Sequence, residues 1–506
     1  MAIKRYQSNA DNTISNAYQG NMTIRATGSN MGATDILETF AIQGQVSSST
    51  NGLESELARI LIKFPVSDII TDRAAGSIPA SGSVSFYLKM YNAEHIRTTP
   101  NNFSISVTAV SASWQEGEGM DMEQYSDLTY GIRGSNWIQS SASTSWTSEG
   151  GDYHASPSTS VSMETGREHI EVDVSEFVEQ WVKGASFSNQ YQATTTAKLN
   201  YGFGVKLSSA YESGEKSYYT KKFFGRGSQF FHKRPTIEAR WDSSRRDNRG
   251  NFYLSSSILP GHENLNKLYV YNYIKGRLRD IADDSSAVPT MKMYYSSGSV
   301  PEGDNRTFYN SSNTAVTSLA ATRLSKGIYY TQFAVTSSTV TATYPYLIDV
   351  WEYDSTEFFT GSTIYPKTHT MLQHNLSDEY ILNISNLKSS YGREETARFR
   401  LYVRPRNWSP NIYTKAVSTP QCTMISTASY EICREVDNFR VIPYGTGSSK
   451  HTVLSHDVSG NYFDLDMSMF ESGYSYKIKF AFYDDGVADY VEQPYEFKFR
   501  VREDVY

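Results

Sequence analysis

Residues 103–110 read FSISVTAV, and residues 83–91 read SVSFYLKMY. In both stretches apolar side chains occupy every second position, with Ser, Thr, Tyr or Lys between them. A period of two predicts strands that bury one face and expose the other. These two stretches therefore predict a β-sandwich in this part of the chain.

Similar strand signals recur along the whole chain. The further segments that we expect to be strands are 59–64, 201–208, 251–258, 265–276, 327–335, 344–353, 397–403, 474–482 and 495–501. One short helix is predicted at 175–183, with Ser175 as N-cap and Gly184 as its stop. The 38 Tyr residues and the 14% share of aromatic residues also favour strands and polar turns. The sequence predicts an all-β protein.

Length and turn spacing predict three domains. A chain of 506 residues has room for about three domains of about 100–200 residues each. We expect domains at 1–245, 246–390 and 391–506, with a polar hinge (DSSRRDN) at 242–248. In the last two, turns about every 8–12 residues favour immunoglobulin-like sandwiches. The stretch 113–160, rich in Gly, Ser and Trp, is expected to lie across the first sandwich as an ordered loop.

Charge and cysteine content bear on the class of protein and its compartment. A net charge of −7 and a pI of 5.8 argue against a general attraction to nucleic acid or to an anionic membrane. The sequence contains no run of about 18 apolar residues, so no transmembrane helix is predicted. The start MAIKRY does not resemble a secretory signal. With only Cys422 and Cys433, we expect folding in a reducing cytosol, although the two thiols could pair across a hairpin.

Residues of catalytic or metal-binding type are not gathered in a recognisable motif. The nine histidines are scattered, and no nucleophile elbow, Walker loop or dinucleotide fingerprint occurs. The strongest enzymatic candidate is an acidic stretch made of Trp114, Glu116, Glu118, Asp121 and Glu123. It could serve a glycosidase or hold calcium, but a solvated acidic loop anchored by the tryptophan is favoured. We predict no enzyme, no catalytic residue, no metal and no cofactor.

A basic segment rich in aromatic residues lies at 216–249. Its ten basic and three acidic residues give a net charge of +7, so the rest of the chain carries −14. The basic residues are Lys216, Lys221, Lys222, Arg226, Lys233, Arg234, Arg240, Arg245, Arg246 and Arg249. The segment could bind single-stranded nucleic acid, dock an acidic protein neighbour, or form a strand pair with solvated charges. The acidity of the whole chain disfavours nucleic acid, and docking on further copies would give a homo-oligomer.

Three tryptophans provide an alternative site. Trp114, Trp137 and Trp146 could be stacking platforms for a host surface polysaccharide, as in a carbohydrate-binding adhesin. The structural explanation, which is favoured, is that their rings pack the long loop onto the sandwich.

Short motifs in the first 245 residues, taken in order, resemble a known family. They include RILIKF at 59–64, GSNW at 134–137, GGDY at 150–153 and YGFG at 201–204. This order is similar to the DNRLRE-type jelly-roll domain, a β-sandwich of adhesive and surface proteins, although the name-giving string itself does not occur. The resemblance implies a jelly roll at 1–245.

The chain as a whole resembles structural proteins of T-even-like phages that infect marine cyanobacteria. The stretches that carry this resemblance include KKFFGRGSQFFHKRP at 221–235 and HDVSGNYFDLDMS at 456–468. It implies a place in the virion, assembly in the host cytoplasm and no active-site residue.

The expected function is that of a non-enzymatic virion protein. It would dock in several copies on the head–neck–tail region or the capsid surface, as a decoration, collar or fibre-attachment component. Its expected partners are other virion proteins of the neck, tail or capsid, with no membrane involved. The alternative is the carbohydrate-binding host-surface adhesin.

Overall fold

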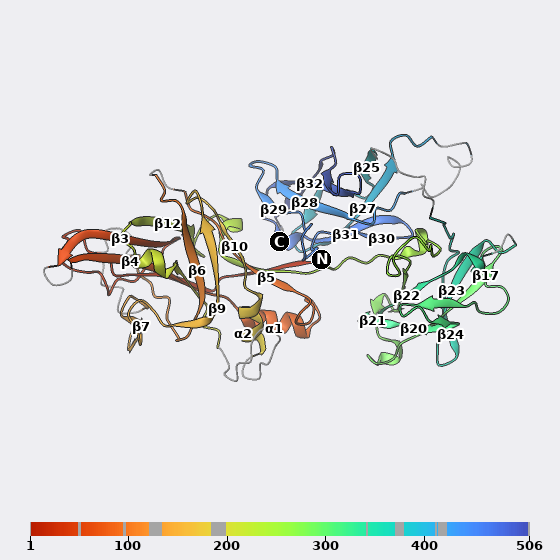
Figure 1. The fold of residues 1–506 in the computed structure, drawn as a ribbon, viewed down its shortest axis with the longest axis horizontal. Coiled ribbons are helices and arrows are strands. Elements are labelled where there is room, and N and C mark those ends of the chain that lie inside the picture. The colour runs from red at the N-terminus through yellow and green to blue at the C-terminus, as the bar shows by residue number, and fades with distance from the viewer. Residues whose placement is uncertain are drawn as a thin grey trace. The chain divides into compact units, whose positions relative to one another are not determined.

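The computed structural model describes residues 2–48, 52–94, 98–120, 134–183, 199–340, 343–369, 379–409, 412 and 422–503. The chain forms two compact units, Ala2–Asp242 and Ser243–Tyr506, both built mainly of strands (Figure 1). The prediction of an all-β protein is confirmed. Among the described residues, no helix is long and apolar enough to cross a membrane.

The first unit is a jelly-roll sandwich of two sheets. The first sheet has the order β1 (Ile3–Gln7), β13 (Thr236–Arg240), β5 (Ser85–Met90), β10 (Ile170–Asp173). The second has the order β12 (Tyr218–Phe224), β3 (Ile36–Ser48), β4 (Gly52–Lys63), β11 (Phe203–Leu207), β6 (Phe103–Val110), β9 (Tyr153–Met163), with β2 (Ala10–Ser15) paired to β4. The order β1-β13-β5-β10 against β4-β11-β6-β9 is that of an eight-strand jelly roll. Successive strands of these eight alternate between the sheets except β6 and β9, which pair within the second sheet. The predicted jelly roll is confirmed, and β2, β3 and β12 extend its second sheet.

The core of the jelly roll lies between the two sheets. The apolar alternation of 103–110 is confirmed, because Val107 faces this core together with Phe203 and Val205 of β11. The predicted helix is confirmed as α2 (Ser175–Lys183). Its Phe177 and Trp181 pack on Phe203, with ring centroids 5.4 and 4.8 Å apart. Two further helices, α1 (Val66–Ala74) and α3 (Ser209–Glu212), follow β4 and β11.

The long Trp-rich stretch covers part of the outer face of the second sheet. It contains a small hairpin, β7 (Gln139–Ser141) and β8 (Thr144–Ser145). The predicted loop is too long by eight residues, because 153–160 belong to the edge strand β9, which pairs with β6. The strand does alternate, with Ala155, Pro157, Val161 and Met163 on one face and serines on the other, but Pro157 and the small residues make this face a weak hydrophobic signal.

The second unit begins with an immunoglobulin-like sandwich. One sheet has the order β14 (Asn266–Tyr271), β22 (Ile328–Ala334), β18 (Phe308–Asn310), β19 (Ala315–Val316), with β21 (Thr322–Ser325) on β22. The other has the order β20 (Ser318–Ala320), β17 (Thr290–Ser296), β23 (Tyr346–Tyr353), β24 (Thr356–Thr360). A separate hairpin joins β15 (Tyr273–Ile274) to β16 (Arg277–Leu278).

The strand predicted at 251–258 is wrong. Only Tyr253 makes a single β-bridge, to Lys367, and the chain then turns. Phe252 and Leu254 are buried as the alternation required, but the three serines that follow give no further apolar position to continue a strand.

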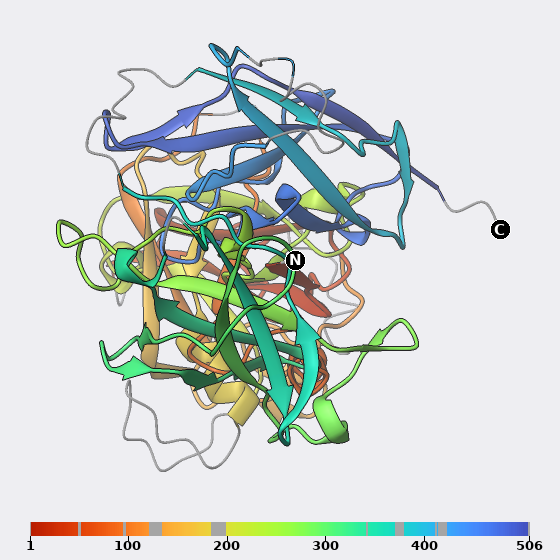
Figure 2. The same cartoon turned by 90° about the vertical axis from the view of Figure 1, so that its right-hand side faces the viewer.

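The C-terminal sandwich, drawn in blue in Figure 2, has immunoglobulin strand order. One sheet has the order β25 (Tyr380–Ile384), β27 (Thr396–Pro405), β31 (Gly460–Asp466), β30 (Ser455–Asp457). The other has the order β26 (Ser390–Gly392), β34 (Phe497–Arg502), β32 (Ser475–Asp484), β28 (Ala428–Arg434), β29 (Arg440–Ile442), with β33 (Asp489–Glu492) on β32. The pair β26–β34 is parallel, with Tyr391 opposite Val501. Short 3-10 turns complete the elements: η2 (Phe231–Lys233), η3 (Asn248–Gly250), η4 (Ile281–Asp283), η5 (Ser337–Thr339) and η6 (Met467–Met469).

Candidate functional site

The ten basic residues of 216–249 are divided between the two units. Arg245, Arg246 and Arg249 belong to the second unit, and the other seven belong to the jelly roll. Three of the ten are buried inside their own unit, namely Lys221, Arg240 and Arg249. For these three the predicted role as docking surface is wrong, because their charges are used by neighbouring groups of the same chain.

Lys221 and Arg240 hold internal polar groups of the jelly roll. The Lys221 ammonium donates to Asn92 Oδ1 at 2.7 Å and to two backbone carbonyls, and burial lowers its pKa to about 8. Arg240 pairs with the fully buried Glu238 and with Glu171. Both cations therefore have their partners inside this unit, and removal of either would leave buried polar or charged groups unpaired.

Arg249 fastens the segment that opens the second unit. Its guanidinium contacts Asp247 Oδ2 at 2.6 Å and the Asp349 carboxylate, and it donates to Tyr269 O at 2.7 Å. Burial raises the pKa of Asp247 to about 6, although the charge and the backbone N–H of Arg249 both act to lower it. His456 Nδ1 lies 3.1 Å from Asp247 O, and burial lowers the pKa of His456 to about 4.

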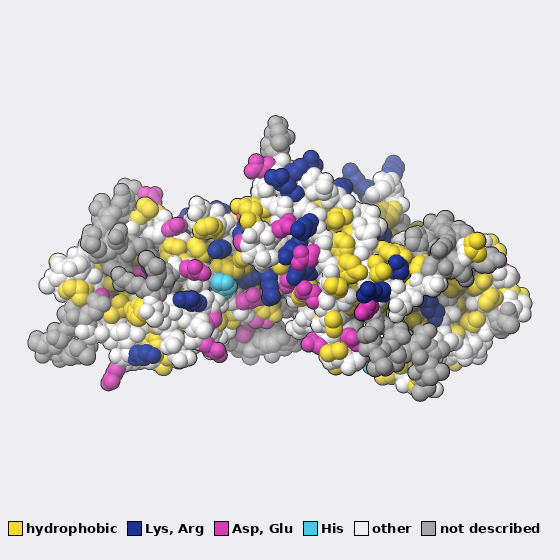
Figure 3. Space-filling model, turned by 90° about the horizontal axis from the view of Figure 1, so that it is seen from above, with side chains coloured by type: hydrophobic (Ala, Val, Ile, Leu, Met, Phe, Trp, Pro, Cys, Tyr) yellow, Lys and Arg dark blue, Asp and Glu magenta, His cyan; other side chains and the backbone are white. Residues whose placement is uncertain are grey.

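A partly exposed group of aromatic and basic side chains lies at the end of β12 and in the turns that follow it. We call Phe224, Phe230, Lys233 and Arg234 the aromatic–cation corner. The Lys233 ammonium lies 5.0 Å from the ring centroids of both Phe224 and Phe230, and Phe230 is 45% exposed. Lys216 and Arg226 are also exposed, although Arg226 is paired with Glu116. On the face shown in Figure 3, basic and acidic side chains are interspersed with exposed hydrophobic ones.

The three tryptophans are buried rather than presented on the surface. Trp114, Trp137 and Trp146 are 9%, 4% and 6% exposed and form one cluster with Leu61 and Val110. The indole nitrogens of Trp114 and Trp146 donate to backbone carbonyls at 2.7 and 2.9 Å. In this structure the rings pack the long loop onto the sheet, so they do not offer stacking platforms.

The acidic stretch does not assemble a carboxylate site among the described residues. Glu116 binds Arg226 through both oxygens and accepts from the backbone nitrogen of Asp11. Asp121 and Glu123 lie outside the described residues. Within the described ranges, no group of three His, Cys, Asp or Glu side chains is arranged to hold a metal ion. Cys422 and Cys433 are free thiols, and burial raises the pKa of Cys433 to about 12.

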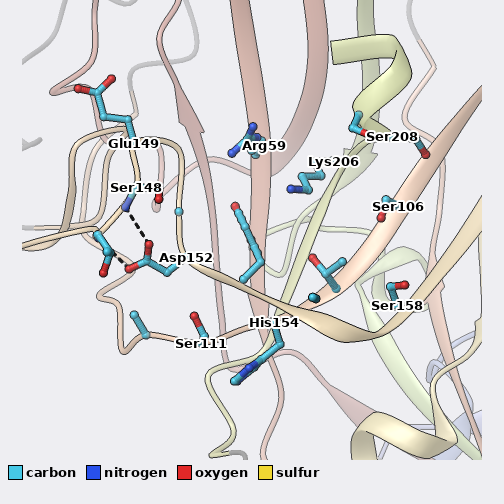
Figure 4. Close-up of a pocket in the computed structure, with 17 residues that line it drawn as sticks. Arg59, Ser106, Ser111, Ser148, Glu149, Asp152, His154, Ser158, Lys206 and Ser208 are labelled. Atoms are coloured by element: carbon cyan, nitrogen blue, oxygen red, sulfur yellow. Dashed lines mark hydrogen bonds between the residues drawn. The ribbon is translucent and has the colours of Figure 1, made fainter. Parts of the chain in front are cut away.

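The structure reveals a polar cleft that sequence reasoning missed. It lies on the outer face of the second jelly-roll sheet, beside the Trp-rich loop, and has a volume of about 920 Å³. Its lining includes Arg59 of β4, Lys206 of β11, Ser106 and Thr108 of β6, and Ser158 of β9 (Figure 4). We call this site the polar cleft.

Two cations stand side by side in the polar cleft. Arg59 is committed to the chain, because it binds both oxygens of Glu212 at 2.9 and 2.8 Å and donates to Gly150 O. The Lys206 ammonium lies 4.4 Å from the Tyr153 ring centroid and has no hydrogen bond or ion pair to any described residue. Burial and the charge of Arg59 lower the pKa of Lys206. Lys206 thus makes no ion pair with any described residue, and the nearby Glu212, whose charge acts on it, is already bound by Arg59.

The floor of the polar cleft depends on a glycine and leaves a hydroxyl without a partner. A Cβ at Gly204 would lie 2.1 Å from Tyr153 Cε1, so only glycine lets the Tyr153 ring lie on β11. Thr108, opposite both Gly204 and Ser158, is 8% exposed, and its Oγ1 makes no hydrogen bond within the described part of the chain. Such an orphaned hydroxyl is costly unless something else satisfies it.

The acids that border the polar cleft do not neutralise Lys206. Both oxygens of Asp152 accept backbone N–H groups, from Thr147 at 2.8 Å and Ser148 at 2.9 Å. Figure 4 shows the Glu149 carboxylate pointing away from Lys206. The sequence signal for this site is the polar side of 103–110 together with Lys206. It could be read as a site only once strand register places these positions together.

Comparisons with known proteins give no family for this chain. No protein-family model and no curated protein matches its sequence. Among solved structures, the N-terminal Ig1-2 module of the Drosophila receptor protein tyrosine phosphatase DLAR is similar at 7% identity with a TM-score of 0.13, covering 48% of this chain and 92% of that one. A DUF4785 family protein from Legionella pneumophila is similar at 7% identity with a TM-score of 0.13, covering 98% of this chain and 91% of that one. Likeness at these scores does not bear on function.

Proposed function

We propose that this chain is a non-enzymatic structural protein of a phage particle. It docks in several copies on neighbouring proteins of the neck, tail or capsid, and the particle is its final location. The proposal is supported by the resemblance of the sequence to phage structural proteins and by three sandwiches that offer broad surfaces for contact.

The observation that carries the docking role is the aromatic–cation corner. Phe230 is 45% exposed, and Lys233 lies against its ring. Aromatic side chains flanked by basic ones are frequent anchors of protein interfaces. An acidic protein surface is the partner that this chemistry fits.

The test compares two double variants in particles assembled with the phage. Phe230→Ala with Lys233→Ala removes the corner, and Tyr273→Ala with Lys275→Ala removes an exposed aromatic and lysine elsewhere. The first pair is expected to lower the copy number per particle by about tenfold or more, and the control pair to leave it unchanged. Absence of the chain from purified particles, by mass spectrometry, would contradict the proposed function.

Carbohydrate binding is the second candidate, and the polar cleft favours it. The cleft is lined by hydroxyl groups of Ser106, Thr108 and Ser158 beside charged side chains. Hydroxyl and charged groups in a cleft of this size suit a sugar better than an apolar ligand. A glycan array with the purified chain tests this function, and the absence of any selective signal would contradict it.

A further inference from the structure

We propose that the polar cleft binds a sugar residue that carries a carboxylate or sulfate group, with Lys206 and Thr108 as its direct contacts. This inference rests on the second candidate function and names the class of sugar. It does not depend on the tryptophans, which are buried.

The first argument is charge. Lys206 follows Val205, which pairs with Ile60, so the next position on β4 across from Lys206 is Arg59. Like charges on neighbouring strands repel each other. The nearby Glu212 acts on Lys206 through its charge, but it is bound by Arg59 and makes no ion pair with Lys206 in the described structure. An anionic group beside Lys206 would supply the missing counter-charge and form a charge-assisted hydrogen bond. A neutral sugar would bring no negative charge to the Lys206 ammonium.

The second argument is the unsatisfied hydroxyl. Thr108 Oγ1 is buried, lines the polar cleft and has no partner among the described residues. Ser106, which is opposite Lys206, and Ser158, which is opposite Thr108, add further hydroxyls on the same face. A row of hydroxyl groups can both donate to and accept from the hydroxyls of a sugar.

The third argument is size and lining. A volume of about 920 Å³ lies within the range of about 300–1,000 Å³ typical of small-ligand sites and is far larger than one inorganic ion needs. Protein interfaces are centred on several aromatic and apolar anchors, whereas most residues that line the polar cleft are polar, and Tyr153, Ala112 and Ala155 are its apolar side chains. These features favour a sugar over a free anion or an acidic segment of a protein.

The experiment titrates the full chain by calorimetry with matched probes. Dextran sulfate oligosaccharides and alginate oligosaccharides carry the anionic groups, and unsulfated dextran oligosaccharides of the same length lack them. Inorganic sulfate alone and a polyglutamate peptide represent the other sources of negative charge. Binding of an acidic oligosaccharide is expected, and it should weaken as NaCl is raised.

Three variants assign the binding to the polar cleft. Lys206→Gln is expected to weaken acidic-oligosaccharide binding by about tenfold or more, and Thr108→Val by about threefold or more. Lys233→Gln removes the same charge from the aromatic–cation corner and should change affinity by less than about twofold. Thermal unfolding of each variant verifies that the jelly roll is intact.

Each remaining outcome overturns the inference in a distinct way. Equal affinity for dextran and dextran sulfate, or unchanged affinity in Lys206→Gln, removes the acidic class but leaves carbohydrate binding in place. If inorganic sulfate binds as tightly as the oligosaccharides, the ligand is a bare anion and not a sugar. If polyglutamate does, the ligand is an acidic protein segment. Binding of no oligosaccharide at all removes both the inference and the second candidate function.

Discussion

Buried polar side chains of the jelly roll differ in how many hydrogen-bond or ion-pair partners the described structure gives them. The ammonium of Lys221 finds three oxygen acceptors, and Glu238 is surrounded by three cations. Thr108, by contrast, keeps a hydroxyl with no partner in the described structure. Well-satisfied groups stabilise the fold, while an unsatisfied one costs stability and points to a ligand.

Replacing Thr108 by valine is expected to stabilise the jelly roll. Valine keeps the shape of the side chain, suits a strand and removes a buried hydroxyl whose desolvation is uncompensated. The free energy of unfolding should rise by about 1 kcal/mol, measured by urea denaturation. Thr108→Ser keeps the hydroxyl and loses the methyl group, so it should not stabilise. A destabilised Thr108→Val would mean that the hydroxyl has a partner.

Glu238 is expected to make the jelly roll sensitive to acid. Arg5, Lys89 and Arg240 hold the pKa of Glu238 well below its ordinary value of 4.5, and this outweighs the effect of burial. A lowered carboxyl pKa contributes stability that is present above about pH 4.5 and is lost as the pH falls below it. Unfolding curves recorded from about pH 5 to about pH 2 should show the free energy of unfolding falling as the pH falls.

Glu238→Gln should cost about 3–5 kcal/mol, because it leaves buried cations without their shared counter-charge. Glu171→Gln removes a carboxylate that also contacts Arg240 but whose side chain is 44% exposed. This control should cost less than about 1 kcal/mol. Similar costs for the two variants would show that burial does not set the strength of these pairs.

Among the elements of the second unit, the segment Ser243–Gly250 is fixed by contacts at both of its ends. Near β30, His456 N donates to Arg245 O at 3.0 Å, and Arg245 N donates to Ser455 Oγ at 2.9 Å. At the other end, Arg249 of η3 reaches Asp349 of β23. From Ser243 onward, the polar stretch that the sequence predicted as a hinge is therefore packed within the second unit.

The His456 contact should weaken as the medium becomes acidic. Burial lowers the pKa of His456 from 6.5 to about 4, so the unfolded segment takes up a proton before the folded one does. Stability from this group is complete above about pH 6.5 and falls by about 3 kcal/mol as the pH drops to about 4. Hydrogen exchange of peptides covering 243–250 and 453–460 measures the loss.

His456→Asn provides the control for this titration. Asparagine can still donate to Asp247 O but does not titrate, while Asp247, with its own raised pKa, titrates in both proteins. Hydrogen-exchange protection of wild type and variant is compared from about pH 4 to about pH 6.5. The difference between the two proteins gives the contribution of the histidine titration. A constant difference over that range would contradict the assignment.

The sequence was informative about elements and less so about their partners. Period-two patterns at 83–91 and 103–110 predicted strands that the structure contains, and the pattern of 175–183 predicted α2. Sequence patterns did not show which charged side chains are buried, since Arg240 and Arg249 were predicted to lie on a docking surface. Their burial depends on Glu238 and Asp349, which reach them only through the fold.

The polar cleft illustrates the same limit. Its two cations, Arg59 of β4 and Lys206 of β11, lie 147 positions apart in the sequence. Neither residue is unusual in its own strand, and the orphaned hydroxyl of Thr108 is a property of packing. Register between β4, β11 and β6 is what brings them together.

At the scale of the whole molecule, the chain consists of two units with separate cores. The core of the jelly roll contains residues from Ala2 to Trp241, and another core begins at Phe252. Fragments 2–242 and 243–506 are therefore each expected to fold, with strand-rich circular dichroism and cooperative unfolding. A fragment starting at 379 lacks the partner of His456 and should be less stable than 243–506. Failure of 2–242 to fold alone would contradict this division.

The parallel pairing of β26 with β34 determines how the C-terminal sandwich responds to a mechanical load. Since β26 lies near the start of this sandwich and β34 near its end, tension applied between the two ends slides these strands past each other. Their backbone hydrogen bonds are then strained together instead of opening one after another. In the proposed phage particle, this sandwich would therefore act as a stiff coupling that transmits force without elongating.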